Sequence, residues 1–431
     1  MNNTDIFKFF DNIYGYESTK KELYTLASAI KNSNSCKELG ISVPRGIVLY
    51  GEPGLGKTTM AIDLIAASER YPIIFRKQES REFAKSLKET FLLAKQNQPS
   101  IILLDDMDKY SNTDENHQNT DEYVAIQTCI DDVKNDNVVI IATANDNRCF
   151  PSSLLRAGRF DRKIWIQAPT VKEATVILQM YLNKASVADD IDAESIARLM
   201  SGKSCAALEA IINEAGIYAI AREQHQIDMK CMVDACLSVF YHASESLDES
   251  NKEKQYKVAV HEAGHAVAHE LLFPNSTALV STRMSNSGGE GITVFDIEND
   301  SSMEQSEKII MCGLAGRAAH EVKFGEPDTG SSNDIKQSLS KATNLICYQA
   351  YNGLKKTDSY SEYESSFTKT QIDIEVNFLI GQLYQKVKKL IADNLEIVDA
   401  VAQELFDKDT LLGKDVRRIL ERYLPKHNSN G

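Results

Sequence analysis

The sequence predicts an α/β domain with a parallel sheet, then a small all-helical unit and a larger, mainly helical domain. Three observations lead to this fold class. Short apolar runs alternate with amphipathic stretches over 45–169, apolar residues recur at helical spacing up to 241, and a polar segment precedes a second helical region. Buried strands separated by helices are typical of a parallel sheet covered on both faces. A length of 431 residues fits two or three domains of about 150 residues.

The α/β region contains five apolar runs that we expect to form strands. Amphipathic stretches between them predict helices around 57–69, 81–96 and 121–134, and the polar segment 111–121 predicts a loop. The expected strands are 46–50, 72–75, 101–104, 138–141 and 164–166.

The second half of the chain is expected to be mainly helical. Ile177, Leu178, Tyr181 and Leu182 share one helical face, and a strand pair is expected around 278–284 and 291–295. The predicted division is 1–169 for the α/β domain, 170–242 for the small helical unit, 243–255 for a linker, 256–424 for the last domain and 425–431 for a tail.

Charge and composition exclude several classes of protein. The net charge of −14 argues against a nucleic-acid-binding face, which would be basic. No apolar run reaches 18 residues and the N-terminus lacks the layout of a signal peptide, so we expect no transmembrane helix. The eight cysteines are scattered, as is typical of reduced core thiols. We therefore expect a soluble, cytoplasmic protein that begins at its own Met1.

A glycine-rich segment follows the first expected strand. Residues 51–58, GEPGLGKT, fit the pattern G-x-x-x-x-G-K-[ST] and lead into an expected helix. Free backbone N–H groups at a helix start attract phosphate, Lys57 can reach the β- and γ-phosphates, and Thr58 can bind Mg²⁺. The residues expected to bind the phosphates of a nucleotide are Pro53, Gly54, Leu55, Gly56, Lys57, Thr58 and Thr59.

Carboxylates and arginines follow the later strands. The strand at 101–104 ends in Asp105 and Asp106, the Walker B arrangement, in which Asp105 acts through the water shell of Mg²⁺ and Asp106 positions the attacking water. Asp106 is one methylene shorter than the usual Glu, and misplacing a catalytic group by about 1 Å costs about 10²-fold in rate. Arg156 and Arg159 suit a charge clamp on the γ-phosphate.

A metal-site motif occurs in the last domain. His261 and His265 fit H-E-x-x-H, which places them one turn apart on one helical face, with Glu262 as the general base. A catalytic Zn²⁺ needs a third protein ligand. His269 lies too far along the same helix and is interpreted as structural. The candidates for the third ligand are Glu321, Asp328 and Asp334.

With these motifs in this order, the chain resembles the FtsH family, whose members join an AAA+ ATPase to a zinc endopeptidase. The resemblance runs from about residue 13 to about residue 420. It implies an α/β P-loop AAA+ domain with a parallel sheet, a small helical lid and a mainly α-helical zinc-metallopeptidase domain. ATP, Mg²⁺ and Zn²⁺ are the implied cofactors, and polypeptides are the implied substrates.

The resemblance also assigns roles to single residues. Ile13 and Gly15 match the segment beside adenine, Asn145 matches sensor 1, and Ala206 belongs to a segment similar to sensor 2. Arg156 and Arg159 match arginine fingers that reach a neighbouring subunit, which implies a homo-oligomeric ring, usually a hexamer. In the last domain the match makes Asp334 the third zinc ligand, and residues 289–293 resemble the edge strand along which substrate lies.

Three departures from the family pattern concern ATP-driven translocation or hydrolysis. Only seven residues separate Phe83 from Phe91, where the family carries its aromatic pore loop, and the second pore loop is replaced by 111–121. Asp106 replaces the Walker B glutamate. The family's N-terminal membrane anchor is also missing from this sequence, whereas the zinc motif is whole.

The sequence therefore predicts an ATP-dependent or ATP-regulated zinc endopeptidase that cleaves unfolded proteins, with weak or absent processive unfolding. One alternative is a nucleotide-controlled scaffold or chaperone with vestigial peptidase activity. Another is a complete AAA+ protease in which Tyr110 or Phe83 supplies the gripping aromatic side chain.

Overall fold

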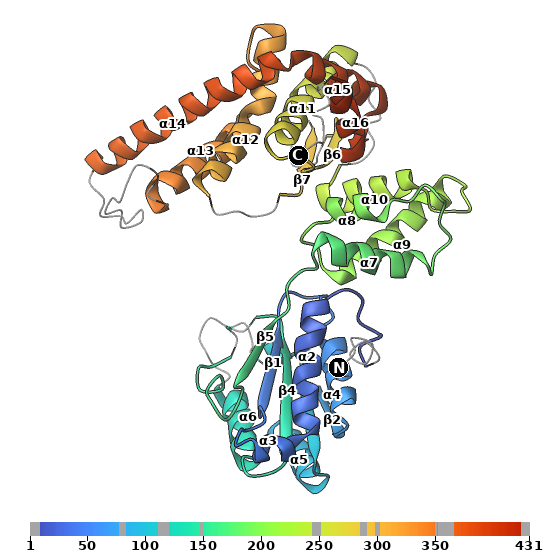
Figure 1. Ribbon diagram of the computed structural model, residues 1–431, viewed down its shortest axis with the longest axis vertical. Coiled ribbons are helices and arrows are strands. Elements are labelled where there is room, and N and C mark those ends of the chain that lie inside the picture. The colour runs from blue at the N-terminus through green and yellow to red at the C-terminus, as the bar shows by residue number, and fades with distance from the viewer. Residues whose placement is uncertain are drawn as a thin grey trace. The chain divides into compact units, whose positions relative to one another are not determined.

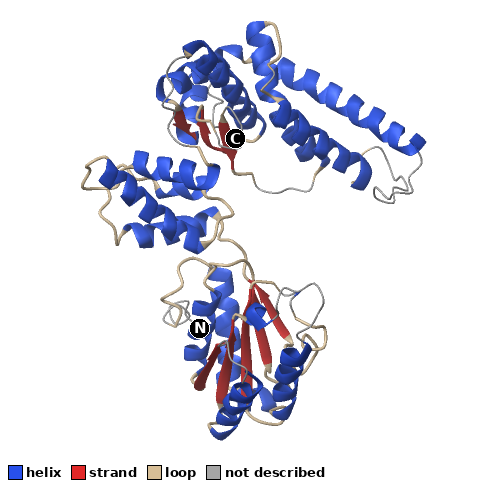
Figure 2. Ribbon diagram, turned by 180° about the vertical axis from the view of Figure 1, so that it is seen from behind, coloured by secondary structure: helices blue, strands red, loops and turns tan. Residues whose placement is uncertain are grey.

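The structure is a computed structural model that divides into two compact units. They comprise Met1–Ser186 with Ser201–Asn213, and Val187–Met200 with Glu214–Gly431. The first unit contains a five-stranded sheet and the second a helical bundle with a small sheet (Figures 1 and 2). The domain boundaries given above remain predictions. The structure describes residues 9–76, 83–110, 120–146, 148, 150–243, 251–284, 291–297, 302–328, 330–349, 351 and 366–423.

The first unit confirms the predicted parallel α/β sheet. Its strand order is β2-β3-β4-β1-β5, and the pairs are all parallel. The three central strands β1, β3 and β4 are buried on both faces, as their continuous apolar runs predict, whereas the edge strands β2 and β5 are partly exposed. The strands are β1 (Gly46–Tyr50), β2 (Tyr71–Arg76), β3 (Ser100–Asp105), β4 (Val138–Ala144) and β5 (Arg162–Trp165).

Helices cover both faces of this sheet. Alternate strand residues such as Val48, Ile102 and Ile140 pack in one cluster with residues of α5 (Phe83–Gln96) and α6 (Thr120–Asp132). The opposite face carries α2 and α4 (Figures 1 and 2). The other helices of this unit, with the bounds of α2 and α4, are α2 (Glu17–Lys31), α3 (Ser33–Glu38), α4 (Lys57–Ser68), η1 (Met107–Tyr110) and α7 (Val171–Leu182).

The strand order brings three polar segments to one edge of the sheet. The glycine-rich loop follows β1, Asp105 ends β3, and Asn145 follows β4, which lies between the other two strands. Ligands of parallel α/β sheets bind at this carboxyl edge.

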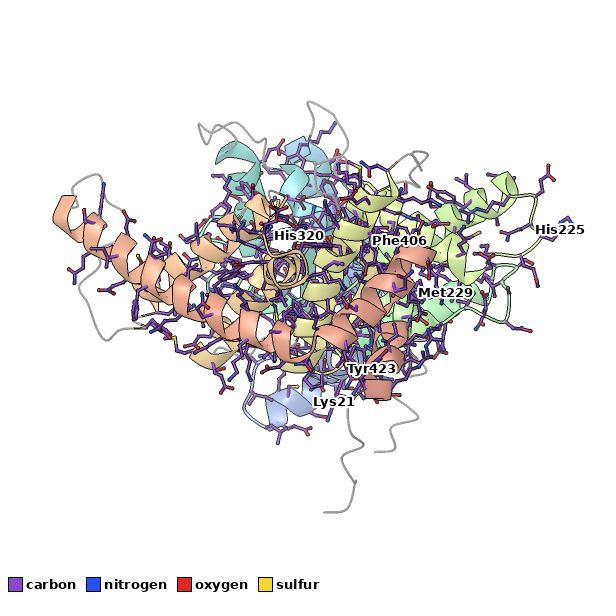
Figure 3. The ribbon with its side chains drawn as sticks, turned by 90° about the horizontal axis from the view of Figure 1, so that it is seen from above. Lys21, His225, Met229, His320, Phe406 and Tyr423 are labelled. Atoms are coloured by element: carbon purple, nitrogen blue, oxygen red, sulfur yellow. The ribbon has the colours of Figure 1, made fainter. Side chains whose placement is uncertain are left out.

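The second unit is a helical bundle built around α11 and α12. A side chain on Gly264 of α11 would place its Cβ 2.5 Å from the Cβ of Ala319 on α12, so the two helices approach closely only because both residues are small. Phe406, labelled in Figure 3, packs edge-on against Tyr256 of α11. The helices of the bundle are α11 (Lys252–Leu272), α12 (Met303–Phe324), α13 (Ser332–Tyr348), α14 (Ser366–Asp393), α15 (Leu395–Lys408) and α16 (Gly413–Tyr423).

A three-stranded antiparallel sheet completes this unit, in the order β7-β6-β8. The predicted strand pair is present as β6 (Thr277–Ser281) and β7 (Ile292–Phe295), whereas β8 (Thr410–Leu412) was not predicted. β7 lies at an edge of the sheet. The unit also contains α8 (Ala193–Leu199) and α10 (Met229–Tyr241), while α9 (Cys205–Ala221) continues from the first unit into the second.

The predicted linker 243–255 is partly helical in the structure, and the predicted loop 111–121 is largely not described. Helix α11 begins at Lys252, inside the predicted linker 243–255, because the Asn251 side chain accepts a hydrogen bond from the Lys254 backbone N–H and caps the helix. Most of the predicted loop 111–121 lies outside the described residues.

None of the described helices combines the length and apolar character needed to cross a membrane.

Candidate metal centre and nucleotide site

The two histidines of the H-E-x-x-H motif point to the same place. Their Nε2 atoms lie 3.1 Å apart, one turn apart on α11. Asp334, in the first turn of α13, brings its Oδ2 atom to 3.1 Å from Nε2 of His261 and 3.4 Å from Nε2 of His265. Two imidazoles and one carboxylate, with ligand atoms within 4.8 Å of one another, form the donor set of a catalytic zinc site.

The surroundings of these donors fit a metal ion. A Cβ atom at Gly316 of α12 would lie 2.5 Å from the Nε2 atoms of both histidines, so glycine leaves the donors accessible on that side. Nδ1 of His265 lies 2.8 Å from the Cys312 carbonyl oxygen. Because a carbonyl only accepts, Nδ1 must carry the proton, which leaves the Nε2 lone pair for a metal.

The structure separates the three acidic candidates for the third ligand. Only Asp334 contacts the Nε2 side of both histidines. Asp328 instead contacts the Nδ1 side of His261, at 2.7 Å. Glu321 is bound by Tyr384 and by Lys388, the latter at 2.8 Å. His269 is buried, stacks on Phe295, and has a pKa well below the usual value because burial disfavours its charged form.

Charge around the centre favours a cation. Burial disfavours the charged form of His261, but hydrogen bonds with Asp328 and Asp334 outweigh it and raise the pKa of this histidine to about 10. Burial likewise opposes ionisation of the two aspartates, and their hydrogen bonds with histidine lower the pKa of each carboxyl well below the usual value. A metal cation would take the place of the proton on Nε2 of His261, which faces Asp334, while Asp328 keeps the proton on Nδ1.

Glu262 lies beside this centre and is held from β7. The Thr293 hydroxyl donates a hydrogen bond of 2.5 Å to Oε2 of Glu262. A Cβ atom on Gly291 would lie 2.4 Å from Oε1, so any larger residue there would displace the Glu262 carboxylate. His261, Glu262, Asp334 and Gly291 line one cleft of about 420 Å³. The sequence predicted these residues but not the Thr293 contact, which joins segments 31 residues apart.

The glycine-rich loop of the first unit holds its lysine with its own backbone. Nζ of Lys57 lies 2.8 Å from the Gly51 carbonyl oxygen, 2.7 Å from that of Glu52, and 2.9 Å from Oδ1 of Asn145. Burial lowers the pKa of this lysine, although nearby aspartates oppose the shift. Gly54 and Gly56 adopt positive φ angles of 78° and 82°, which open the loop in the way phosphate binding requires.

The Walker B residue Asp105 contacts both the glycine-rich loop and an arginine of β2. Oδ1 of Asp105 accepts hydrogen bonds of 2.8 Å from Thr58 and from Thr143, as expected for a carboxylate beside the Mg²⁺ position. Oδ2 of Asp105, however, pairs with Nε of Arg76 at 3.0 Å.

Asp106 turns away in a left-handed conformation, with φ of 55°, and pairs with Lys109 at 2.5 Å. The sequence did not single out Arg76 or Asp108. Asp108 accepts a hydrogen bond of 2.6 Å from the Asn145 side chain.

A small pocket of about 110 Å³ lies where the adenine is expected. Ile13, Leu55, Gly56 and Thr59 line it together with residues of α7 and Cys205. Gly15, at φ of 67°, passes so close to Glu173 that a Cβ atom would lie 2.9 Å from the Glu173 Cβ.

Beside this pocket, the start of α9 contacts the loop. The Ala206 backbone N–H donates to the Gly54 carbonyl oxygen at 3.1 Å. The structure therefore brings the predicted adenine-side, phosphate and sensor 2 segments together. Pro53 is exposed in the loop.

The two predicted arginine fingers differ in their surroundings. Arg159 makes a two-pronged contact with Asp131 of α6, with N–O distances of 2.9 and 2.7 Å. Arg156 is exposed and has no ion pair within the described residues. Arg156 is therefore the less engaged of the two within this chain.

Family models match most of the chain in three parts. Residues 47–168 match the ATPase family associated with various cellular activities (AAA), residues 190–234 match the AAA+ lid domain, and residues 248–419 match peptidase family M41.

Similar proteins match along nearly the whole chain. The ATP-dependent zinc metalloprotease FtsH 2 of Phytoplasma mali (strain AT) is 29% identical over 95% of this chain and 62% of its own length. FtsH 3 of Symbiobacterium thermophilum is 28% identical over 96% of this chain and 71% of its own length. The FtsH protease of Thermus thermophilus is 28% identical over 96% of this chain and 70% of its own length.

The fold and the two sites define an AAA+ ATPase domain with its lid, joined to a metallopeptidase domain of family M41. The motif order, the parallel sheet and the matches over both halves agree. The chain carries an AAA domain, an AAA+ lid and a peptidase M41 domain in this order, and the predicted resemblance to the FtsH family is confirmed.

Proposed function

We propose that this protein is an ATP-regulated zinc endopeptidase that cleaves unfolded polypeptides and has little capacity to unfold stable domains. The observation that carries the proposal is the convergence of His261, His265 and Asp334 beside Glu262 in one cleft. A donor set of this kind leaves a coordination position open for catalysis.

The cleft suits an extended chain. β7 is an edge strand that runs past Glu262, and Gly291 lines the cleft at its start. A substrate added to such an edge would be held by main-chain hydrogen bonds, which give affinity with little sequence preference. Unfolded polypeptides provide the extended backbone that this mode of binding requires.

The side chains divide the chemistry among them. Nε2 of His261, Nε2 of His265 and a carboxylate oxygen of Asp334 would hold Zn²⁺, which when bound polarises a carbonyl and acidifies water. Glu262 would accept a proton at Oε1 from the attacking water and return it to the leaving amine. The Thr293 hydroxyl fixes the other oxygen of Glu262 during this transfer. General acid–base catalysis of this kind contributes about 10²–10⁴-fold in rate.

The nucleotide site supports ATP binding more than rapid hydrolysis. Lys57, Thr58 and Asp105 are arranged for phosphate and Mg²⁺, but Arg76 occupies one oxygen of Asp105 and Asp106 is short and paired with Lys109. Phe83 and Phe91 both lie in the uninterrupted helix α5, where the family carries its pore loop. These features support regulation by ATP with weak processive unfolding.

We further propose that the protein assembles as a homo-oligomer, of six subunits as in the family pattern. The exposed Arg156 supports this proposal, since it is available to a nucleotide bound by a neighbouring subunit. The seven described cysteines are all free thiols, which supports residence in a reducing compartment such as the cytoplasm.

Casein cleavage tests this proposal. Wild-type protein should cleave casein in a zinc-dependent manner, and Glu262→Gln should lose about 10²–10⁴-fold of the rate while retaining zinc. Equal cleavage by both proteins would refute the peptidase. If neither protein cleaves casein and ATP still changes the oligomeric mass, the alternative of a nucleotide-controlled scaffold or chaperone is supported instead.

A further inference from the structure

Asp328 bridges the two segments that carry the proposed zinc ligands. Its Oδ2 atom lies 2.7 Å from Nδ1 of His261 on α11. Its Oδ1 atom accepts a hydrogen bond of 2.9 Å from the Ser331 backbone N–H. Ser331 is the N-cap residue of α13, and Asp334 lies in the first turn of that helix. One carboxylate therefore connects a ligand on α11 to the start of the helix that carries the third ligand.

This connection is itself held by α12. The Arg317 guanidinium donates to the Asp328 carbonyl oxygen at 3.2 Å and to the Ser331 hydroxyl at 3.4 Å. Ser331 is buried, and the Asp328 side chain is 18% exposed, so solvent has limited access to these bonds. Arg317 thus holds the backbone segment from which the Asp328 carboxylate projects.

The chemistry of the contact determines which nitrogen of His261 can bind a metal. A carboxylate only accepts hydrogen bonds, so Nδ1 of His261 must be the donor. The lone pair of a neutral His261 is then on Nε2, the atom that faces Asp334 and His265. A carboxylate on the outer nitrogen also orients the ring and increases the basicity of the ligand.

We infer that Asp328 is a positioning residue of the zinc site, holding His261 in its ligating tautomer and setting its position relative to Asp334. This inference rests on the zinc site proposed above. Asp328 would act through His261, since it contacts the ring nitrogen that faces away from the metal position.

Zinc affinity of Asp328→Asn and Asp328→Ala, measured in the full chain by competition with a chromophoric chelator, tests the inference. Loss of such a partner typically costs about 10–100-fold in metal affinity, and we expect both variants to show it. The Asn variant tests positioning apart from the hydrogen bond to the Ser331 N–H, because an Asn side-chain oxygen accepts from nearby backbone N–H groups as Asp does. The two bonds of Asp328 use different oxygens, and the one oxygen of an amide cannot stand in both positions, so the Asn side chain faces either Nδ1 of His261 or the Ser331 N–H with its NH₂ group.

Asp228→Asn is the matched control. Like Asp328, Asp228 accepts a hydrogen bond from the backbone N–H three residues further on, that of Cys231 at 2.8 Å, but it contacts none of the proposed zinc ligands. Its zinc affinity should equal that of the wild type. Thermal unfolding of the zinc-free proteins checks that each variant folds, and the Asn variant decides the question if the Ala variant does not.

Two results would overturn the inference in distinguishable ways. If the folded Asp328 variants bind zinc as well as the wild type does, Asp328 only holds the turn that precedes α13, and the proposed peptidase stands. If the wild type binds no zinc, the proposed function fails together with the inference.

Discussion

The metal centre and the nucleotide site differ in where their charged groups are directed. In the metal centre, the Nδ1 atoms of the two histidines donate hydrogen bonds to Asp328 and to the Cys312 carbonyl oxygen, which leaves both Nε2 atoms directed at one point. In the nucleotide site, the groups that should serve hydrolysis are already engaged, since Arg76 binds Asp105 and Lys109 binds Asp106. The contrast supports the proposal of a peptidase site joined to a weak motor.

Removing one key residue from each site should show that the two are separate. Asp334→Ala should lose peptidase activity by about 10³-fold or more along with bound zinc, since a catalytic site needs three protein ligands. Lys57→Ala should keep zinc and lose about 10–100-fold in ATP affinity, since it removes a charged hydrogen-bonding partner of the phosphates. Zinc content and equilibrium nucleotide binding measure the two effects. Loss of zinc from Lys57→Ala would contradict the separation.

A methyl group at Gly316 should block the metal centre directly. Its Cβ atom would lie 2.5 Å from both Nε2 atoms, so Gly316→Ala should weaken zinc binding by about 10–100-fold, as disturbed ligand orientation does elsewhere. Gly381→Ala on α14 is the control, because a Cβ atom there meets no atom within 4 Å. Chelator competition gives both affinities. Equal affinities in the two variants would show that the donors do not converge as described.

A methyl group at Gly291 should act on the base without affecting the metal. Its Cβ atom would lie 2.4 Å from Oε1 of Glu262 and displace that carboxylate. We expect a fall in kcat of about 10-fold or more, since small misplacements of catalytic groups are costly. Zinc content should stay at the wild-type level. A variant with wild-type kcat would mean that β7 does not lie against the base.

Restoring the longer Walker B side chain should produce the smallest change. Asp106→Glu extends the carboxylate by one methylene and should raise the ATPase rate by up to about 10-fold, because Arg76 still occupies Asp105. The rate of phosphate release measures it. A wild-type rate already equal to that of Asp106→Glu would show that the shorter residue costs nothing.

The sequence could predict the features whose functional residues lie close together along the chain. The glycine-rich loop and the H-E-x-x-H motif place their functional atoms within one turn of a loop or helix, so neighbours in sequence are neighbours in space. The third ligand is 73 residues from His261, and only the family resemblance favoured Asp334 over Asp328 and Glu321.

Other features depend on tertiary contacts that have no local pattern. β8 has only three residues and forms because β6 offers a free edge beside it. The contacts of Arg76 with Asp105 and of Thr293 with Glu262 join separate strands and helices, and their residue types alone carry no signal.

The contrast between the two sites is tested most directly by offering the protein one substrate in two states. An unfolded polypeptide and the same polypeptide carrying a stably folded domain should be incubated with the full chain, zinc, ATP and Mg²⁺, with Glu262→Gln as the blank. We predict zinc-dependent cleavage of the unfolded polypeptide and survival of the folded domain. ATP-dependent degradation of the folded domain at a comparable rate would contradict the account, because it would require the processive motor that the nucleotide site and α5 argue against.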